Sequence, residues 1–208
     1  MKKIILIISF LLILPLAAEQ GEFQIFAGAG AYIPLKQYTQ DKTVYIYSSY
    51  NIPLELYFGI TDNFDIGIHG SFSRLTDTNI DKEYNGISGR EYFDYQHVNL
   101  DVQLRYNFLP GFIFFAPHLI VGVGNNIETY RNREFYLNDN ELYNNYDEED
   151  YTKGNLNFQG GIDITSRIWW IFMLRVEALY NYSINGSQYM ELNAYIGIDW
   201  MIKSYGGR

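Results

Sequence analysis

The chain has 208 residues, which is enough for one domain with an ample core. Its 48% hydrophobic and 19% charged residues exclude a disordered or collagen-like chain. A formal charge of -9 argues against a nucleic-acid partner, and the lack of cysteine excludes a disulfide framework and a thiolate zinc site.

The N-terminal residues have the pattern of a secretory signal peptide. Lys2 and Lys3 precede an apolar run over residues 4–14, and the small residues Ala17 and Ala18 follow it. The run is shorter than the ~20 residues that a spanning helix needs, and an uncleaved anchor is the alternative. We therefore predict a signal peptide over residues 1–18 and an exported domain over residues 19–208. Without Lys2 and Lys3 the charge of this domain is 13 − 24 = -11.

The exported domain alternates apolar and polar residues, which is typical of half-buried strands. In the clearest segment Val98 and Leu100 share one face, while Asn99 and Asp101 share the other. The alternation predicts eight strands in chain order, over residues 22–33, 50–61, 64–73, 95–108, 112–124, 154–164, 170–182 and 189–202.

The connections between these strands alternate in length. Short turns are predicted at residues 61–63, 109–111 and 165–167, and polar loops at residues 34–49, 74–94, 125–153 and 183–188. In an up-and-down antiparallel barrel, alternate connections lie at opposite ends, so the loops project from one rim and the turns from the other. Outer-membrane barrels have this asymmetry. The sequence thus predicts an all-β fold, an eight-stranded antiparallel up-and-down transmembrane β-barrel without an exposed edge.

A soluble ligand-binding barrel has the same alternation with its faces exchanged, and it is the alternative. Three features favour lipid on the outside. The apolar face is almost free of charge over about ten residues per strand, which is the length of a tilted crossing. The polar face is rich in Asn, Gln, Ser and Gly, unlike the Lys and Glu surface of soluble strands. Aromatic residues gather at strand ends, as in a membrane girdle.

We expect the girdle to include Phe58, Phe108, Trp169, Trp170, Trp200, Tyr180 and Tyr182. Its loop-side ring is also expected to contain Tyr92, Phe93, Tyr95, Tyr151 and Tyr189.

The end of the chain carries a second pattern. Tyr195, Gly197, Trp200 and Ile202 are spaced as a polar residue, a glycine two positions on, and aromatic or apolar residues three and five positions after the glycine. This spacing is similar to the terminal strand signal of bacterial outer-membrane proteins, although six further residues follow it here. With the export signal and the eight strands, the chain resembles the small outer-membrane barrels of the OmpA/OmpX type. The resemblance implies a location in the cell outer membrane, with outer-membrane lipid and the barrel assembly machinery as partners.

The polar faces place charged residues in the predicted lumen. They are Glu55, Asp101, Arg105, Arg175, Glu177, Glu191 and Asp199. A barrel of eight strands is just wide enough for its side chains to fill, and buried charges must be paired. We therefore expect a Glu/Arg network centred on Arg105 and Arg175 that plugs the barrel. A narrow channel for ions or small solutes is the alternative.

One strand also carries residues suited to acyl transfer. His69 and Ser71 share a face, with Asp65 four residues earlier, and this chemistry needs a base, a nucleophile and a carboxylate. The pair resembles the His-x-Ser of the lipid A deacylases, although Phe72 stands where that family usually has Asn. Because the face is predicted to be lumenal, away from lipid, we expect no catalysis and no cofactor, and a lipid-modifying enzyme is the alternative.

The loops are the remaining candidate for a function. The acidic run at residues 147–150 lacks the alternation and the central glycine of an EF-hand loop, so we expect no metal there. Tyr and Asn in the loops at residues 74–94 and 125–153 are adaptable contact residues. The sequence thus predicts a structural or surface-interaction role, with host or surface ligands bound through these two loops.

Overall fold

The computed structural model describes residues 22–39, 42–44, 48–109, 115–137, 141–143, 149–169, 171–184 and 187–201. The predicted signal peptide, residues 1–18, lies outside them. Within these ranges no helix has the length and apolar character needed to cross a membrane. The strands are β1 (Glu22–Thr39), β2 (Lys42–Val44), β3 (Ser49–Gly59), β4 (Phe64–Tyr84), β5 (Ile87–Asn107), β6 (Ala116–Leu137), β7 (Glu141–Leu142), β8 (Tyr151–Trp169), β9 (Phe172–Ser183) and β10 (Gln188–Met201).

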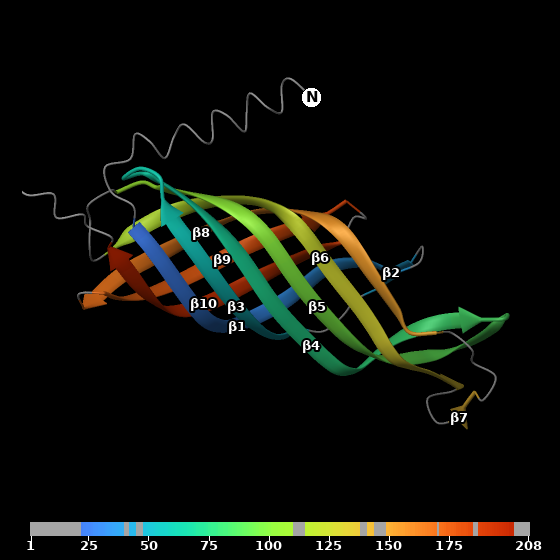
Figure 1. Ribbon diagram of the computed structural model, residues 1–208. Helices are drawn as coiled ribbons and strands as arrows, with labels where there is room; N and C mark the ends of the chain where they lie inside the picture. The colour runs from blue at the N-terminus through green and yellow to red at the C-terminus, as the bar shows by residue number, and fades with distance from the viewer. Residues whose placement is uncertain are drawn as a thin grey trace, which may run out of the picture.

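Eight long strands form a closed antiparallel barrel (Figure 1). Each long strand pairs with its neighbours along the chain, and β10 closes the wall by pairing with β1 from Glu22–Met201 to Lys36–Gln188. The short strands β2 and β7 pair only with β1 and β6, outside this closed path. The predicted eight-stranded up-and-down barrel is therefore confirmed.

The strand register fixes the tilt of the strands. Following paired residues once around the barrel leads from Phe172 back to Tyr182 on the same strand, an advance of 182 − 172 = 10 residues. With a rise of about 3.3 Å per residue and about 4.8 Å between strands, this shear corresponds to a tilt of roughly 40°. Tilted strands of this kind bring side chains from distant parts of the sequence to the same height in the lumen.

The period-two pattern separates the two surfaces of the wall as predicted. On β5, Leu100 points outward and is 59% exposed, whereas Asp101 points inward and is 1% exposed. On β3, the outward Leu54 alternates with the inward Glu55 in the same way. The most exposed residues of the wall are thus apolar, and the most buried are polar or charged, the reverse of a water-soluble barrel.

The two longest predicted loops are largely strand, which corrects the sequence interpretation. β4 and β5 continue as a hairpin to Tyr84 and Ile87, where Asn85 and Gly86 form the turn. β6 continues to Leu137, although residues 125–137 were predicted as loop. These extensions were missed because charged residues such as Glu91 and Arg133 interrupt the apolar residues of the inner face, so the apolar alternation stops while the backbone pairing continues.

We call residues 76–84, 87–94 and 131–137, which belong to β4, β5 and β6, the projecting sheet. In Figure 1 it extends beyond the other strands at the loop end of the barrel, next to β7.

Candidate functional site

Arg175 lies at the centre of an ion-pair core in the lumen. It extends from β9 to Glu55 of β3, and its Nη2 lies 3.2 Å from Glu177 Oε2. The Tyr195 hydroxyl is 2.9 Å from Glu55 Oε1 and 2.6 Å from Glu177 Oε1. The guanidinium also lies 4.3 Å from the ring centroids of Phe26 and Tyr195. The buried charges are therefore paired, and aromatic faces cover the cation.

Arg105 of β5 forms a second core next to the first, nearer the turn end of the barrel. Its Nη2 lies 2.6 Å from Asp65 Oδ2, its Nη1 lies 3.8 Å from Asp163 Oδ2, and it donates a hydrogen bond to Gln24. The ring centroid of Tyr57 is 4.2 Å from the Arg105 guanidinium and 5.3 Å from that of Arg175. The two cores therefore share an aromatic wall.

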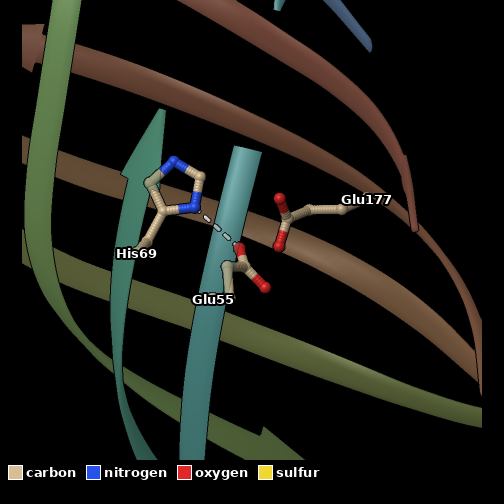
Figure 2. Close-up of side chains that lie close together, drawn as sticks. All are labelled: Glu55, His69 and Glu177. Carbon is tan, nitrogen blue, oxygen red and sulfur yellow. Dashed lines mark hydrogen bonds and ion pairs between the residues drawn. The ribbon is translucent and has the colours of Figure 1, made fainter. Parts of the chain in front are cut away.

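His69 joins β4 to the first core, as Figure 2 shows. Its Nδ1 lies 2.7 Å from Glu55 Oε1, and its Nε2 lies 3.3 Å from Glu191 Oε2. Ser71 Oγ donates a 2.9 Å hydrogen bond to Glu191 Oε1. Glu191 thus contacts both the His69 imidazole and the Ser71 hydroxyl. Acyl transfer instead needs a direct hydrogen bond between the base and the nucleophile.

The predicted lumen charges do not form the single Glu/Arg network that was expected. Arg105 is paired with Asp65 and Asp163, not with a glutamate. Asp101 accepts hydrogen bonds from asparagines, and Asp199 is paired with Arg167. The tilt of the strands, which the sequence does not state, decides which charges meet at one height.

Sequence reasoning missed Asp163 and Arg167 and did not assign Asp65 to this network. Asp65 lies two positions from Gly67 and four from His69, so the period-two alternation of the strand places it on the lumenal face. Asp163 lies an even number of positions from Asn157 and Gln159 on the same strand, so it shares their face, and both are also buried. The alternation therefore contained the signal that would have found these carboxylates.

Glu55, His69 and Glu177 also form a potential ligand set for a metal ion. One ligand atom of each lies within 4.8 Å of the others, and carboxylates with imidazole suit transition metals. However, the guanidinium of Arg175 contacts both carboxylates from the same side chain. A fixed cation is thus already paired with both carboxylates, so the arrangement is that of an ion-pair core.

An aromatic cluster fills the lumen towards the loop end. It consists of Tyr32, Phe93, Tyr95, Tyr130 and Tyr189. The rings of Tyr32 and Tyr189 lie 5.0 Å apart, and His97 lies 4.6 Å from Tyr189. Phe93, Tyr95 and Tyr189 were predicted to face lipid, and this prediction is wrong. The same correction applies to Tyr151, which packs against the cluster. Tyr95 has the parity of the buried Asn99, so its inward direction could have been recognised from the alternation.

The other predicted girdle residues divide into those the structure describes and those it does not. Phe58, Phe108, Trp169, Tyr180 and Tyr182 are exposed on the outside of the barrel. Tyr92 belongs to the projecting sheet. Trp170 and the side chain of Trp200 lie outside the described residues.

The projecting sheet carries both charged and aromatic residues on each face, and the fully buried Phe135 lies on the inner face opposite Glu91. On the inner face, Glu91 lies 3.2 Å from Lys82 Nζ and 2.6 Å from Arg133 Nε. On the outer face, the rings of Tyr92 and Tyr136 meet edge to face at 5.1 Å. The hydrogen bond to the neighbouring Glu134 raises the pKa of Tyr136.

Tyr151 lies at the base of this sheet, where β8 begins. Its ring stacks on Tyr130 at 4.5 Å, and the Arg133 guanidinium lies 5.1 Å from its centroid. Burial raises the pKa of the Tyr151 hydroxyl, so this side chain is a neutral hydrogen-bonding group over the physiological pH range.

Solved structures share this architecture, although no protein-family model and no curated protein matches the sequence. The outer membrane protein OprG from Pseudomonas aeruginosa is 12% identical, with a TM-score of 0.60 over 88% of this chain and 97% of that one. The N-terminal β-barrel domain of Pseudomonas aeruginosa OprF is 10% identical, with a TM-score of 0.52 over 87% and 100%. Neisserial surface protein A is 11% identical, with a TM-score of 0.52 over 88% and 98%. At these identities the likeness concerns the fold.

The decisive observation is that this fold carries an apolar exterior around a charged lumen. The chain is an integral outer-membrane β-barrel. Three residues of the predicted assembly signal, Tyr195, Gly197 and Trp200, lie on β10. Tyr195 faces the lumen, and the ring of Phe26 occupies the space that Gly197 leaves open. The backbone of Trp200 pairs with Phe23 of β1, and Ile202 lies outside the described residues.

Proposed function

We propose that this outer-membrane barrel is plugged, has no catalytic activity, and acts through contacts made by its projecting sheet. The observation that supports this most directly is the filled lumen, in which two ion-pair cores and the aromatic cluster lie one above the other. An eight-stranded barrel has room for little more than its own side chains. The projecting sheet, by contrast, extends paired strands beyond the apolar wall (Figure 1).

Planar-bilayer recording tests the plugged lumen. We expect no steady large-conductance openings from the purified, folded barrel. The Tyr95→Ala/Tyr189→Ala variant, which shortens two buried rings of the aromatic cluster, is the positive control and should raise the frequency of openings. Steady openings of the unaltered protein would contradict the plugged barrel.

A shortened hairpin tests the role of the projecting sheet. Deleting residues 79–84 and 87–92 joins Thr78 and Phe93 through the existing Asn85-Gly86 turn. These two residues are already paired, and an even number of deleted residues per strand keeps the hydrogen-bonding type and the faces unchanged. We expect attachment to host cells or surface ligands to be lost, while the barrel keeps its heat-modifiable migration on gels. Unchanged attachment by the folded, shortened barrel would contradict the proposed surface role.

A narrow cation channel is the second candidate, because buried carboxylates outnumber buried arginines among the described residues. An acidic lumen attracts cations and repels anions. If small openings occur, the reversal potential in a salt gradient should lie towards the cation equilibrium potential. A reversal potential on the anion side would exclude this candidate.

The lipid-modifying enzyme is tested with His69→Ala. His69 and Ser71 are buried and point away from the lipid-facing surface. We expect the lipid composition of cells that carry the variant to match that of cells with the unaltered protein. Loss of a lipid modification in the folded variant would overturn the non-catalytic assignment.

A further inference from the structure

The rim at the turn end of the barrel differs between its two halves. On one side of the rim, the polar turn Thr61-Asp62-Asn63 joins β3 to β4, and its residues Thr61 and Asp62 are exposed. Beside β5, β6, β8 and β9 the exposed rim residues are apolar. They are Phe108, Leu109, Phe115, Ile168, Trp169 and Ile171.

The apolar half of the rim is one continuous surface. β5 pairs with β6 near this end through Asn107 and His118, and Phe108 donates a backbone hydrogen bond to Pro117. β6 and β8 are paired down to Ala116 and Thr165. β8 continues beyond this pairing to Trp169, which pairs with Phe172 of β9. The apolar residues of three neighbouring strand ends therefore lie side by side.

This surface is continuous with the lipid-facing wall. On β8, outward apolar residues extend from Leu156 to Ile168, with Gly160 and Ser166 between them, and Trp169 follows at 69% exposure. On β3 the outward apolar residues extend only from Tyr50 to Phe58. The apolar wall is thus taller on the β8 side, and it reaches the rim there.

We propose that this half of the rim is embedded in the phospholipid of the adjacent leaflet, while the β3–β4 turn remains in water. A contiguous apolar surface of this kind marks an interaction site, and its continuity with the lipid-facing wall identifies lipid as the occupant. The nearby Arg167 is paired with Asp199 of the lumen, so its charge is neutralised on the inner side of the wall. The bilayer therefore meets the barrel at different heights on its two sides.

Fluorescence quenching tests this arrangement. The first protein keeps only Trp169, through the substitutions Trp170→Phe and Trp200→Phe. The matched reporter replaces Trp169 with Phe as well and carries Asp62→Trp at the same end of the barrel. Both are folded into phosphatidylcholine vesicles whose acyl chains are brominated, or into plain vesicles with iodide on both sides. We expect bromolipid to quench Trp169 strongly and the reporter tryptophan weakly. Iodide should quench the reporter tryptophan strongly and Trp169 weakly.

Thiol labelling gives the same comparison without changing any tryptophan, because the chain has no cysteine. In vesicles, Thr61→Cys should react readily with a water-soluble maleimide, and Leu109→Cys should react much more slowly. Heat-modifiable migration identifies the folded variants.

Two outcomes would overturn the proposal. If iodide quenches Trp169 as strongly as the reporter, the apolar rim is exposed to water in a bilayer, as expected for a docking site of a periplasmic protein. If bromolipid quenches both positions equally, the rim is not embedded on one side only.

Discussion

At the scale of single residues, the lumen shows how this barrel keeps charges in a buried position. Arg175 has two carboxylate partners and three aromatic neighbours, and the Tyr195 hydroxyl bridges the carboxylates. Removing one member of a buried ion pair is costly because the remaining charge stays buried without its partner. Replacing all members together is much less costly, since no buried charge remains.

Arg175→Met should therefore lower the free energy of unfolding by about 3–5 kcal/mol, as expected for a broken buried pair. The matched control is Arg90→Met on the projecting sheet, whose partner Asp81 is 90% exposed. This control should cost about 1 kcal/mol or less. Urea unfolding in vesicles, followed by gel migration, measures both. The triple variant Arg175→Met/Glu55→Gln/Glu177→Gln should recover part of the loss, and no recovery would argue against the ion-pair explanation.

Two glycines provide a second comparison between single residues. A Cβ at Gly124 would overlap the carbonyl oxygen of Leu100 and the main chain of Asp101, whereas a Cβ at Gly160 meets nothing within 4 Å. Gly124→Ala should therefore destabilise the barrel by about 1–3 kcal/mol through overpacking. Gly160→Ala should be neutral or slightly stabilising. Equal midpoints in urea would show that the wall accommodates a methyl group at Gly124.

At the scale of elements, the β4–β5 hairpin depends on its turn. Asn85 and Gly86 have φ values of 52° and 79°, the left-handed region that a two-residue hairpin turn requires. Asn-Gly is the strongest short hairpin signal in a sequence, and it lies in the middle of the segment predicted as loop. Charged residues such as Lys82 and Glu91 interrupt the apolar residues of the flanking strands, so the apolar alternation gave no sign of them.

Gly86→Val should loosen this hairpin and leave the barrel intact. A residue with a side chain pays roughly 1–2 kcal/mol in the left-handed region, and a β-branched residue pays more. Hydrogen exchange of the peptides that cover residues 76–94 should become faster, while residues 98–107 keep their protection. Ser88→Ala in the same hairpin is the control. Unchanged exchange in Gly86→Val would show that the sheet does not depend on its turn.

The sequence predicts the faces of the strands well, and the partners of the side chains poorly. Alternation alone placed Glu55, Asp101 and Arg175 in the lumen, where they are found. It did not reveal that Arg105 meets Asp163, because that contact depends on the tilt accumulated over three neighbouring strands. Aromatic residues at strand ends were ambiguous for a different reason. Tyr95 and Tyr180 both lie near the loop end, and only their parity separates the lumen from the lipid.

At the scale of the whole molecule, the barrel has three levels along its axis. The turn rim is apolar on one half, the central wall is apolar all round, and the projecting sheet rises at the loop end on three strands (Figure 1). The lumen is filled alongside the central wall. The proposed ligand contacts of the projecting sheet are therefore separated in space from the proposed lipid contacts of the rim, so the shortened hairpin and the rim variants are expected to act independently.

The closing pair of strands has a consequence for how the protein is made. Glu22 pairs with Met201, so the wall is completed by residues 201 − 22 = 179 positions apart. Contacts of such long sequence separation form slowly, because the ends of a long chain must first be brought together. β1 must therefore wait until β10 has been synthesised before the wall can close. During this interval the apolar exterior has neither lipid nor a closed wall around it, so the unclosed chain is prone to aggregate.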